Sequence, residues 1–295
     1  MLRVLVVTLY SGENEFEECL NSVRSQVGAK CDHKVIKNLP KHEAHQKLYK
    51  LFNDSRQSYD FMVKLDADMA FATEKSLTNL LEFFDDGIDV VSATVLDGLT
   101  GMDMDAIHIY TNRCFFHYDS GDPLFTDQVK IEFPGRKLKI VDHDHNVMHA
   151  FDPSEFQSFM FGVHRAMKVM QHGFMVPKLN YSFHQRKIIS RCFSRYKSGD
   201  FDVSKYAILG AGLVYDGVIK DSALYAKDDY RALFEDRKGE SKYLDDKRFK
   251  SENLLTLPSI IGTSRFTLAA FSYAFRRMKM IILPDRWANC TSRNL

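Results

Sequence analysis

The sequence of 295 residues lacks the features of several specialised classes of protein. It has only five cysteines, and no two of them form a C-x-x-C pair, which argues against a disulfide framework and a thiolate zinc site. We therefore expect a reducing compartment. The sequence also lacks an excess of charge of one sign, because 40 basic side chains stand against 39 acidic ones. This balance disfavours nucleic acid as a partner.

Long apolar runs are missing as well. A membrane-spanning helix needs roughly 20 apolar residues, and the nearest candidate, residues 266–283, is interrupted by Arg276, Arg277 and Lys279. The apolar N-terminal stretch is followed at once by glutamates and has no cleavage site of small residues. We expect a cytoplasmic protein. Since residues 266–280 combine apolar and basic side chains, they predict either a helix on the inner face of an anionic membrane or one packed on the protein.

What the sequence does contain, in its first hundred residues, is an alternation of two patterns. Short apolar runs typical of buried strands cover residues 4–7, 33–36, 59–65 and 88–95, and helical spacing covers residues 15–26, 41–53 and 76–84. This order predicts an α/β fold with a doubly wound, Rossmann-like sheet. From Pro153 onward, apolar residues recur at three- and four-residue steps. We therefore expect an α/β domain at residues 1–150 and a mainly helical region at residues 151–295.

Two acids, Asp66 and Asp68, directly follow one of the predicted strands. In an open α/β sheet, ligands bind at the carboxyl ends of the strands. Two carboxylates that flank one point can hold a hard divalent cation and leave positions open for phosphate oxygens. The D-x-D pattern alone is common, and two solvated loop aspartates are the simpler interpretation.

The surrounding motifs strengthen the functional interpretation. Residues 8–14 read TLYSGEN, residues 19–26 read CLNSVRSQ, Ala44 and His45 lie in the helix after the second strand, and residues 64–68 read KLDAD. In this order they resemble GT-A fold glycosyltransferases of the family 2 type, with their T-x-Y-N-x-E turn, S-(I/V)-x-x-Q helix end, A-x-N element and L-D-A-D strand end. The resemblance covers residues 2–95. The sequence departs from it at Ser11 and at His45, where the family has asparagine.

The resemblance implies a hexosyltransferase-type enzyme. A sugar would pass from a nucleotide-diphosphate donor, with a UDP-sugar favoured, to a glycan or lipid-linked acceptor in bacterial surface polysaccharide or lipopolysaccharide synthesis. It also implies Mn²⁺ or Mg²⁺, which would stabilise the charge that grows on the leaving diphosphate. By analogy, residues 1–150 form the nucleotide-sugar-binding domain and residues 151–295 complete the acceptor side. The donor would contact Thr8, Tyr10, Glu13, Ala44, Lys64, Asp66 and Ala67, and the metal Asp66 and Asp68.

A further metal ligand is expected in the histidine-rich segment 142–149. A neutral imidazole combined with carboxylates suits manganese-class ions. We favour His149, with His143 or His145 as alternatives. Two other interpretations stay open: a self-contained zinc site made by all three histidines, which would suit a hydrolase, and an exposed polar loop without a ligand.

Residues 97–134 have little periodicity and predict insertions and short strands over an active site. An inverting transferase needs a base, usually a carboxylate, to deprotonate the acceptor hydroxyl, and the resemblance implies that this residue comes from the middle region. The candidates there are Asp119, Asp122 and Asp127, of which we favour Asp127 and, second, Asp122. A retaining enzyme would need no such base. In the predicted helix that follows, Lys168 is a candidate for binding the diphosphate, although a solvated lysine is the simpler interpretation.

Two other functions compete with sugar transfer. A nucleotidyltransferase would also place paired acids at a strand end, but it usually carries a Gly-rich, basic N-terminal signature, and here Gly12 is followed by glutamates. A catalytically inactive GT-A protein, acting as a sugar-binding module or scaffold, would be free to lose its metal ligands. The presence of Asp66, Asp68 and His149 argues against that alternative.

Overall fold

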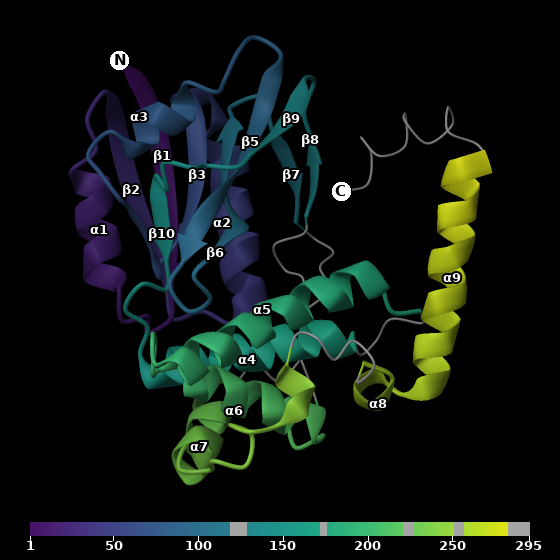
Figure 1. The fold of residues 1–295 in the computed structure, drawn as a ribbon. Coiled ribbons are helices and arrows are strands. Elements are labelled where there is room, and N and C mark those ends of the chain that lie inside the picture. Colours follow the sequence, from purple (N-terminus) through teal and green to yellow (C-terminus); the bar gives the residue numbers. More distant parts are fainter. Residues whose placement is uncertain (119–128, 172–175, 221–226, 251–256, 283–295) are drawn as a thin grey trace. The chain divides into compact units, whose positions relative to one another are not determined.

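The computed structural model describes residues 1–118, 129–171, 176–220, 227–250 and 257–282 (Figure 1). The chain divides into two compact units. The first comprises residues 1–158, 201–204 and 221–238, and the second comprises residues 159–200, 205–220 and 239–295.

The first unit is built on a mixed β-sheet with the strand order β2-β1-β3-β6-β5-β10-β4, and β9 pairs with β5. Its strands are β1 (Leu2–Tyr10), β2 (Ala29–Lys37), β3 (Phe61–Asp66), β4 (Met69–Phe71), β5 (Ile88–Asp97), β6 (Met102–Thr111), β9 (Arg136–Ile140) and β10 (Val147–His149). Strands β7 (Phe115–His117) and β8 (Lys130–Glu132) form a separate antiparallel pair. The expected α/β class is confirmed.

Strand β6 corrects one detail of the predicted topology. It lies between β3 and β5 and is antiparallel to both, so these two strands are not neighbours. The sequence pattern had suggested only insertions and short strands in this region. The sheet is therefore mixed rather than doubly wound and wholly parallel.

Helices cover the sheet because its central strands are apolar on both faces. In β1, Val4, Leu5, Val6 and Val7 are all fully buried, and successive side chains of a strand point to opposite faces. Helix α2 (Lys41–Ser55) buries Leu48 against the face that carries Leu5 and Val7. The other helices of this unit are α1 (Phe16–Arg24), α3 (Ser76–Leu81), α7 (Lys227–Arg237), the short η1 (Arg56–Ser58) and the first turn of α4 (Glu155–Met170).

The second unit is helical, as expected for the C-terminal region. It contains the rest of α4, together with α5 (Leu179–Ser198), α6 (Ser204–Tyr215, from Lys205 onward), η2 (Lys247–Phe249), α8 (Leu257–Ile261) and α9 (Thr263–Ile282). Helices α4 and α6 approach so closely that a Cβ atom on Gly162 would lie 1.8 Å from the carbonyl oxygen of Ala207. Only glycine permits this contact. None of the helices in the described residues is both long enough and apolar enough to cross a membrane.

Three chain segments meet at the carboxyl ends of β3, β5 and β10. The parallel ladder between β5 and β10 sets His149 opposite Asp97, and β10 also pairs with β4. The Ala150 amide donates to the Asp68 carbonyl at 2.9 Å, and the Gly98 amide donates to the His149 carbonyl at 2.8 Å. These backbone bonds fix where the side chains at the strand ends point.

Candidate functional site

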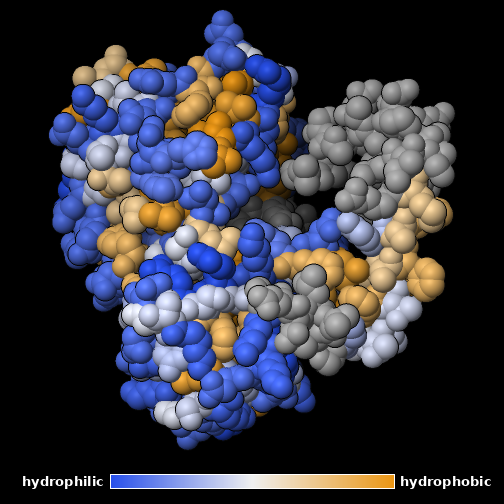
Figure 2. All heavy atoms as spheres, viewed as in Figure 1, coloured by the Kyte–Doolittle hydropathy of each residue, from blue (hydrophilic) through white to orange (hydrophobic). Residues whose placement is uncertain are grey.

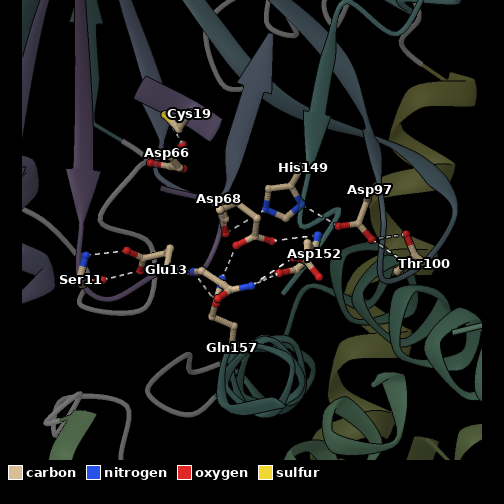
Figure 3. Close-up of polar contacts among 12 residues, drawn as sticks. Ser11, Glu13, Cys19, Asp66, Asp68, Asp97, Thr100, His149, Asp152 and Gln157 are labelled. Atoms are coloured by element: carbon tan, nitrogen blue, oxygen red, sulfur yellow. Dashed lines mark hydrogen bonds and ion pairs between the residues drawn. The ribbon is translucent and has the colours of Figure 1, made fainter. Parts of the chain in front are cut away.

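Three charged side chains lie in contact at these strand ends: His149 stands between Asp68 and Asp97 (Figure 3). His149 Nδ1 is 2.6 Å from Asp97 Oδ2, and His149 Nε2 is 3.4 Å from Asp68 Oδ2. Asp97 is fully buried, whereas the Asp68 side chain keeps 28% of its surface exposed. The imidazole is therefore oriented from the inside by one carboxylate and faces a partly open carboxylate on its other side.

The backbone explains this arrangement. His149 and Asp97 are directly opposite in a parallel ladder, so their side chains leave the sheet on the same face. The Thr100 amide and hydroxyl both donate to Asp97 Oδ1, the amide at 2.7 Å, which leaves Oδ2 for His149. Gly98 is required here, because a Cβ atom on it would lie 2.2 Å from the Ala150 carbonyl oxygen.

The charges of Asp68 and Asp97 keep a proton on His149. Burial by itself lowers the pKa of His149, but the Asp68 and Asp97 carboxylates outweigh it and raise the pKa to about 10. Burial also opposes ionisation of Asp68, yet the charge and hydrogen bond of His149 leave the pKa of Asp68 below its usual value. A positive charge is thus stabilised between two carboxylates.

The first acid of the D-x-D pattern points elsewhere. Lys64 Nζ donates to Asp66 Oδ2 at 2.7 Å, and Lys64 is itself buried. Figure 3 shows the Asp66 side chain near Cys19, apart from the contact between Asp68 and His149. The structure therefore brings two of the three predicted metal ligands together and holds Asp66 in an ion pair. Within the described residues, no group of three or more His, Cys, Asp and Glu side chains could hold a metal ion.

The turn after β1 has its own polar contacts. Both the amide and the hydroxyl of Ser11 donate to the Glu13 carboxylate (Figure 3). The Tyr10 ring stacks on Phe16 with centroids 4.1 Å apart. Thr8 is fully buried, and its hydroxyl lies 2.9 Å from His33 Nε2. Of the predicted donor contacts in this region, Glu13 lies in the loop, Tyr10 ends β1, and Thr8 is buried within β1.

The remaining predicted residues fall into three groups. Ala44 and Ala67 are buried in the first unit, and Lys168 is buried in the second unit. His143 is exposed, and His145 Nε2 lies 3.0 Å from Asp103 Oδ1, so the alternative zinc site of three histidines is not formed. The two favoured candidates for the catalytic base, Asp127 and Asp122, lie outside the described residues.

Sequence reasoning missed Asp97 and a second polar network. Glu15 is almost fully buried and accepts from Gln157 Nε2 at 2.7 Å, and Gln157 Oε1 in turn accepts from the Asn14 amide at 2.7 Å. Burial, and to a smaller extent the charge of Asp68, raise the pKa of Glu15. This network fastens the turn after β1 to the chain that follows β10. A signal for Asp97 was present, because it comes two residues after the predicted strand 88–95, much as Asp66 directly follows the predicted strand 59–65.

The residues present fit a divalent cation held by few protein groups. A carboxylate and an imidazole nitrogen face each other, and the imidazole is oriented through its second nitrogen by a buried carboxylate, as is usual for metal-binding histidines. Magnesium and manganese are commonly held by one or two protein groups, with substrate phosphates and water supplying the rest. Asp68 and His149 meet that requirement.

No protein-family model and no curated sequence matches the chain. Among solved structures it is similar to S. aureus TarS 1–349, with 13% identity and a TM-score of 0.33 over 67% of this chain and 72% of that one. It is similar to a glycosyltransferase involved in glycosylation of the major capsid of PBCV-1, with 11% identity and a TM-score of 0.27 over 37% of this chain and 59% of that one. It is also similar to mouse xyloside xylosyltransferase 1, with 10% identity and a TM-score of 0.25 over 38% of this chain and 68% of that one. These structures are at most 13% identical to the chain, and their TM-scores are all below 0.5.

Proposed function

We propose that the protein is a metal-dependent glycosyltransferase that takes a hexose from a nucleotide-diphosphate donor, with a UDP-sugar favoured. The acceptor would be a glycan or a lipid-linked glycan of a bacterial surface polysaccharide or lipopolysaccharide. The observation that carries this proposal is the Asp68–His149 pair at the strand ends, with His149 oriented by Asp97. The proposal includes a cytoplasmic location at the inner face of the membrane.

In this proposal, Asp68 and His149 hold the divalent cation, with Mn²⁺ favoured by the imidazole and Mg²⁺ as the alternative. When bound, the cation would stabilise the negative charge that develops on the leaving nucleoside diphosphate. Asp97 acts as a positioning residue: by accepting from Nδ1, it directs Nε2 toward Asp68. For the cation to bind, His149 must lose the proton that the two carboxylates now stabilise.

The other predicted residues take roles around this centre. Asp66, held by Lys64, contributes to the donor site from the same strand end. Tyr10 and Glu13 would contact the nucleotide. The buried Thr8, Ala44 and Ala67 would pack beneath the nucleotide pocket and define its shape. Asp127, or Asp122, would deprotonate the acceptor hydroxyl in an inverting reaction.

Thermal shift with UDP, GDP, TDP and CMP, each with and without Mn²⁺, tests the proposal. A ligand at about 100 times its Kd stabilises the folded state by about 2.7 kcal/mol, so a nucleotide that binds with the metal raises the melting midpoint. We expect a manganese-dependent shift with one nucleoside diphosphate. The shift should disappear in Asp68→Asn and in His149→Gln, each compared with its own ligand-free midpoint.

The matched control is His145→Gln. His145 lies on the same segment, but it pairs with the exposed Asp103, so its variant should keep the full shift. A shift that survives in Asp68→Asn would overturn the assigned site. If the wild-type protein responds to none of the nucleotides, the transferase proposal fails, and a scaffold protein that has kept the fold becomes the better explanation.

A further inference from the structure

Helix α9 (Thr263–Ile282) has two different faces. One face packs within the second unit: Ala269 is buried, α9 contacts α5, and the Arg265 guanidinium donates to the Gln171 carbonyl at 3.1 Å. This face meets the expectation of a helix packed on the protein. On the other side of the helix, several large side chains are exposed.

The outward face carries a stripe of large apolar side chains. Leu268, Phe271, Phe275 and Met278 are 50%, 71%, 57% and 53% exposed, and their spacing of three, four and three residues places them on one side of a helix. Of the twelve large apolar side chains that are exposed in the described residues, five lie in α9. Figure 2 shows apolar residues gathered along this helix. Single exposed apolar residues are ordinary, but a continuous stripe marks an interaction surface.

The charge of α9 indicates what the stripe contacts. The helix has four basic residues, namely Arg265, Arg276, Arg277 and Lys279, and no acidic residue, although basic and acidic residues nearly cancel in the whole chain. A basic helix with an apolar face lies in the headgroup region of a bilayer, where anionic lipids attract its charges and the acyl chains accept its apolar side chains. Although α9 has 20 residues, it is not both long and apolar enough to cross a membrane.

We propose that α9 docks the protein on an anionic lipid bilayer, with Leu268, Phe271, Phe275 and Met278 inserted at the headgroup–acyl boundary. This inference deepens the peripheral location in the proposed function, but it does not depend on sugar transfer. Vesicle binding and nucleotide binding can therefore fail separately.

Co-sedimentation of the full chain with vesicles tests the docking surface. We expect binding to vesicles of phosphatidylcholine and phosphatidylglycerol at a ratio of about 7:3, and much weaker binding to phosphatidylcholine alone or at high salt. The double variant Phe271→Glu/Phe275→Glu should lose about tenfold or more of the binding, since two apolar side chains are replaced by charges that the lipid surface repels. Its thermal midpoint and its manganese-dependent nucleotide shift should stay those of the wild type.

The matched control is Phe83→Glu, because Phe83 is an exposed phenylalanine of the first unit and its variant adds one acid without touching α9. This variant should bind the mixed vesicles as the wild type does. Equal binding by the α9 double variant would overturn the proposal, and so would equal binding to neutral and anionic vesicles. Light scattering tests the remaining alternative, a second copy of the chain. If the wild type is a dimer that binds no vesicles, and the α9 double variant is a monomer, the stripe is a dimer interface and the membrane proposal is wrong.

Discussion

The strand-end site and the outer face of α9 depart from the ordinary distribution of residues in opposite ways. At the strand ends, a carboxylate and an imidazolium are buried, although charged groups normally face water. On α9, phenylalanine, leucine and methionine face water, although such side chains normally enter a core. Neither arrangement is what folding alone would select, so both point to a contact with something outside the chain.

The two regions differ in how firmly the fold holds them. Asp97 receives hydrogen bonds from the Thr100 amide and from His149, and the backbone around it is tied to β10. The four side chains of the stripe on α9 are 50–71% exposed, and the opposite face of the helix packs on the second unit. Changes in the site should therefore alter stability and ligand binding together, whereas changes in the stripe should alter binding alone.

The largest effect is expected for Asp97→Ala. It removes one partner of a buried ion pair, and such a loss typically costs about 3–5 kcal/mol of the free energy of unfolding. We expect a loss near about 3 kcal/mol in urea denaturation, because His149 keeps Asp68 as a partner. Asp103→Ala breaks the exposed pair with His145 and should cost less than about 1 kcal/mol. Equal losses in the two variants would contradict the structural difference between the pairs.

Part of the candidate site could be predicted from the sequence, because a strand end is a local signal. Asp68 follows a predicted strand directly, and His149 was favoured among three histidines because the family resemblance implies a further metal ligand. The structure places these two side chains 3.4 Å apart. Asp97 was missed, although it also ends a strand, because its importance comes from its register with His149 in a ladder between segments 52 residues apart. Strand β6 was missed because its polar residues, such as Asp103 and Asp105, interrupt the apolar run expected of a buried strand.

Gly98→Ala should have the next largest effect. The added Cβ would meet the Ala150 carbonyl oxygen at 2.2 Å, so β5 and β10 must separate where Asp97 holds His149. Overpacking of this kind typically costs about 1–3 kcal/mol, and here it should also weaken manganese-dependent nucleotide binding. Gly239→Ala is the control, since nothing lies within 4 Å of a Cβ at that position. A Gly98→Ala variant with unchanged stability would show that the strand ends can move apart freely.

A third effect sharpens the contrast between buried histidines. Burial lowers the pKa of His33 to about 4, and the positive charge of Arg24 adds to this effect, whereas His149 lies between two carboxylates. A histidine with a lowered pKa stabilises the fold above its unfolded pKa of about 6.5, and this contribution is lost as the pH falls toward 4. Between pH 7 and pH 4, the wild type should lose about 2 kcal/mol more than His33→Gln in chemical denaturation. Parallel curves for the two proteins would mean that His33 titrates normally.

The smallest effect on stability is expected on the outer face of α9. Phe271 and Phe275 are mostly exposed, so their replacement by glutamate removes little packing and should change the free energy of unfolding by no more than about 0.5 kcal/mol. On the opposite face, Ala269→Glu would bury a carboxylate and should cost more than about 2 kcal/mol. Urea denaturation of the two variants, side by side, separates the faces. If the exposed pair proves as costly as Ala269→Glu, the stripe packs against the protein in solution and is not free to meet a membrane. If the double replacement leaves the free energy of unfolding unchanged, fold stability does not explain why Phe271 and Phe275 are exposed to solvent, and a binding partner does.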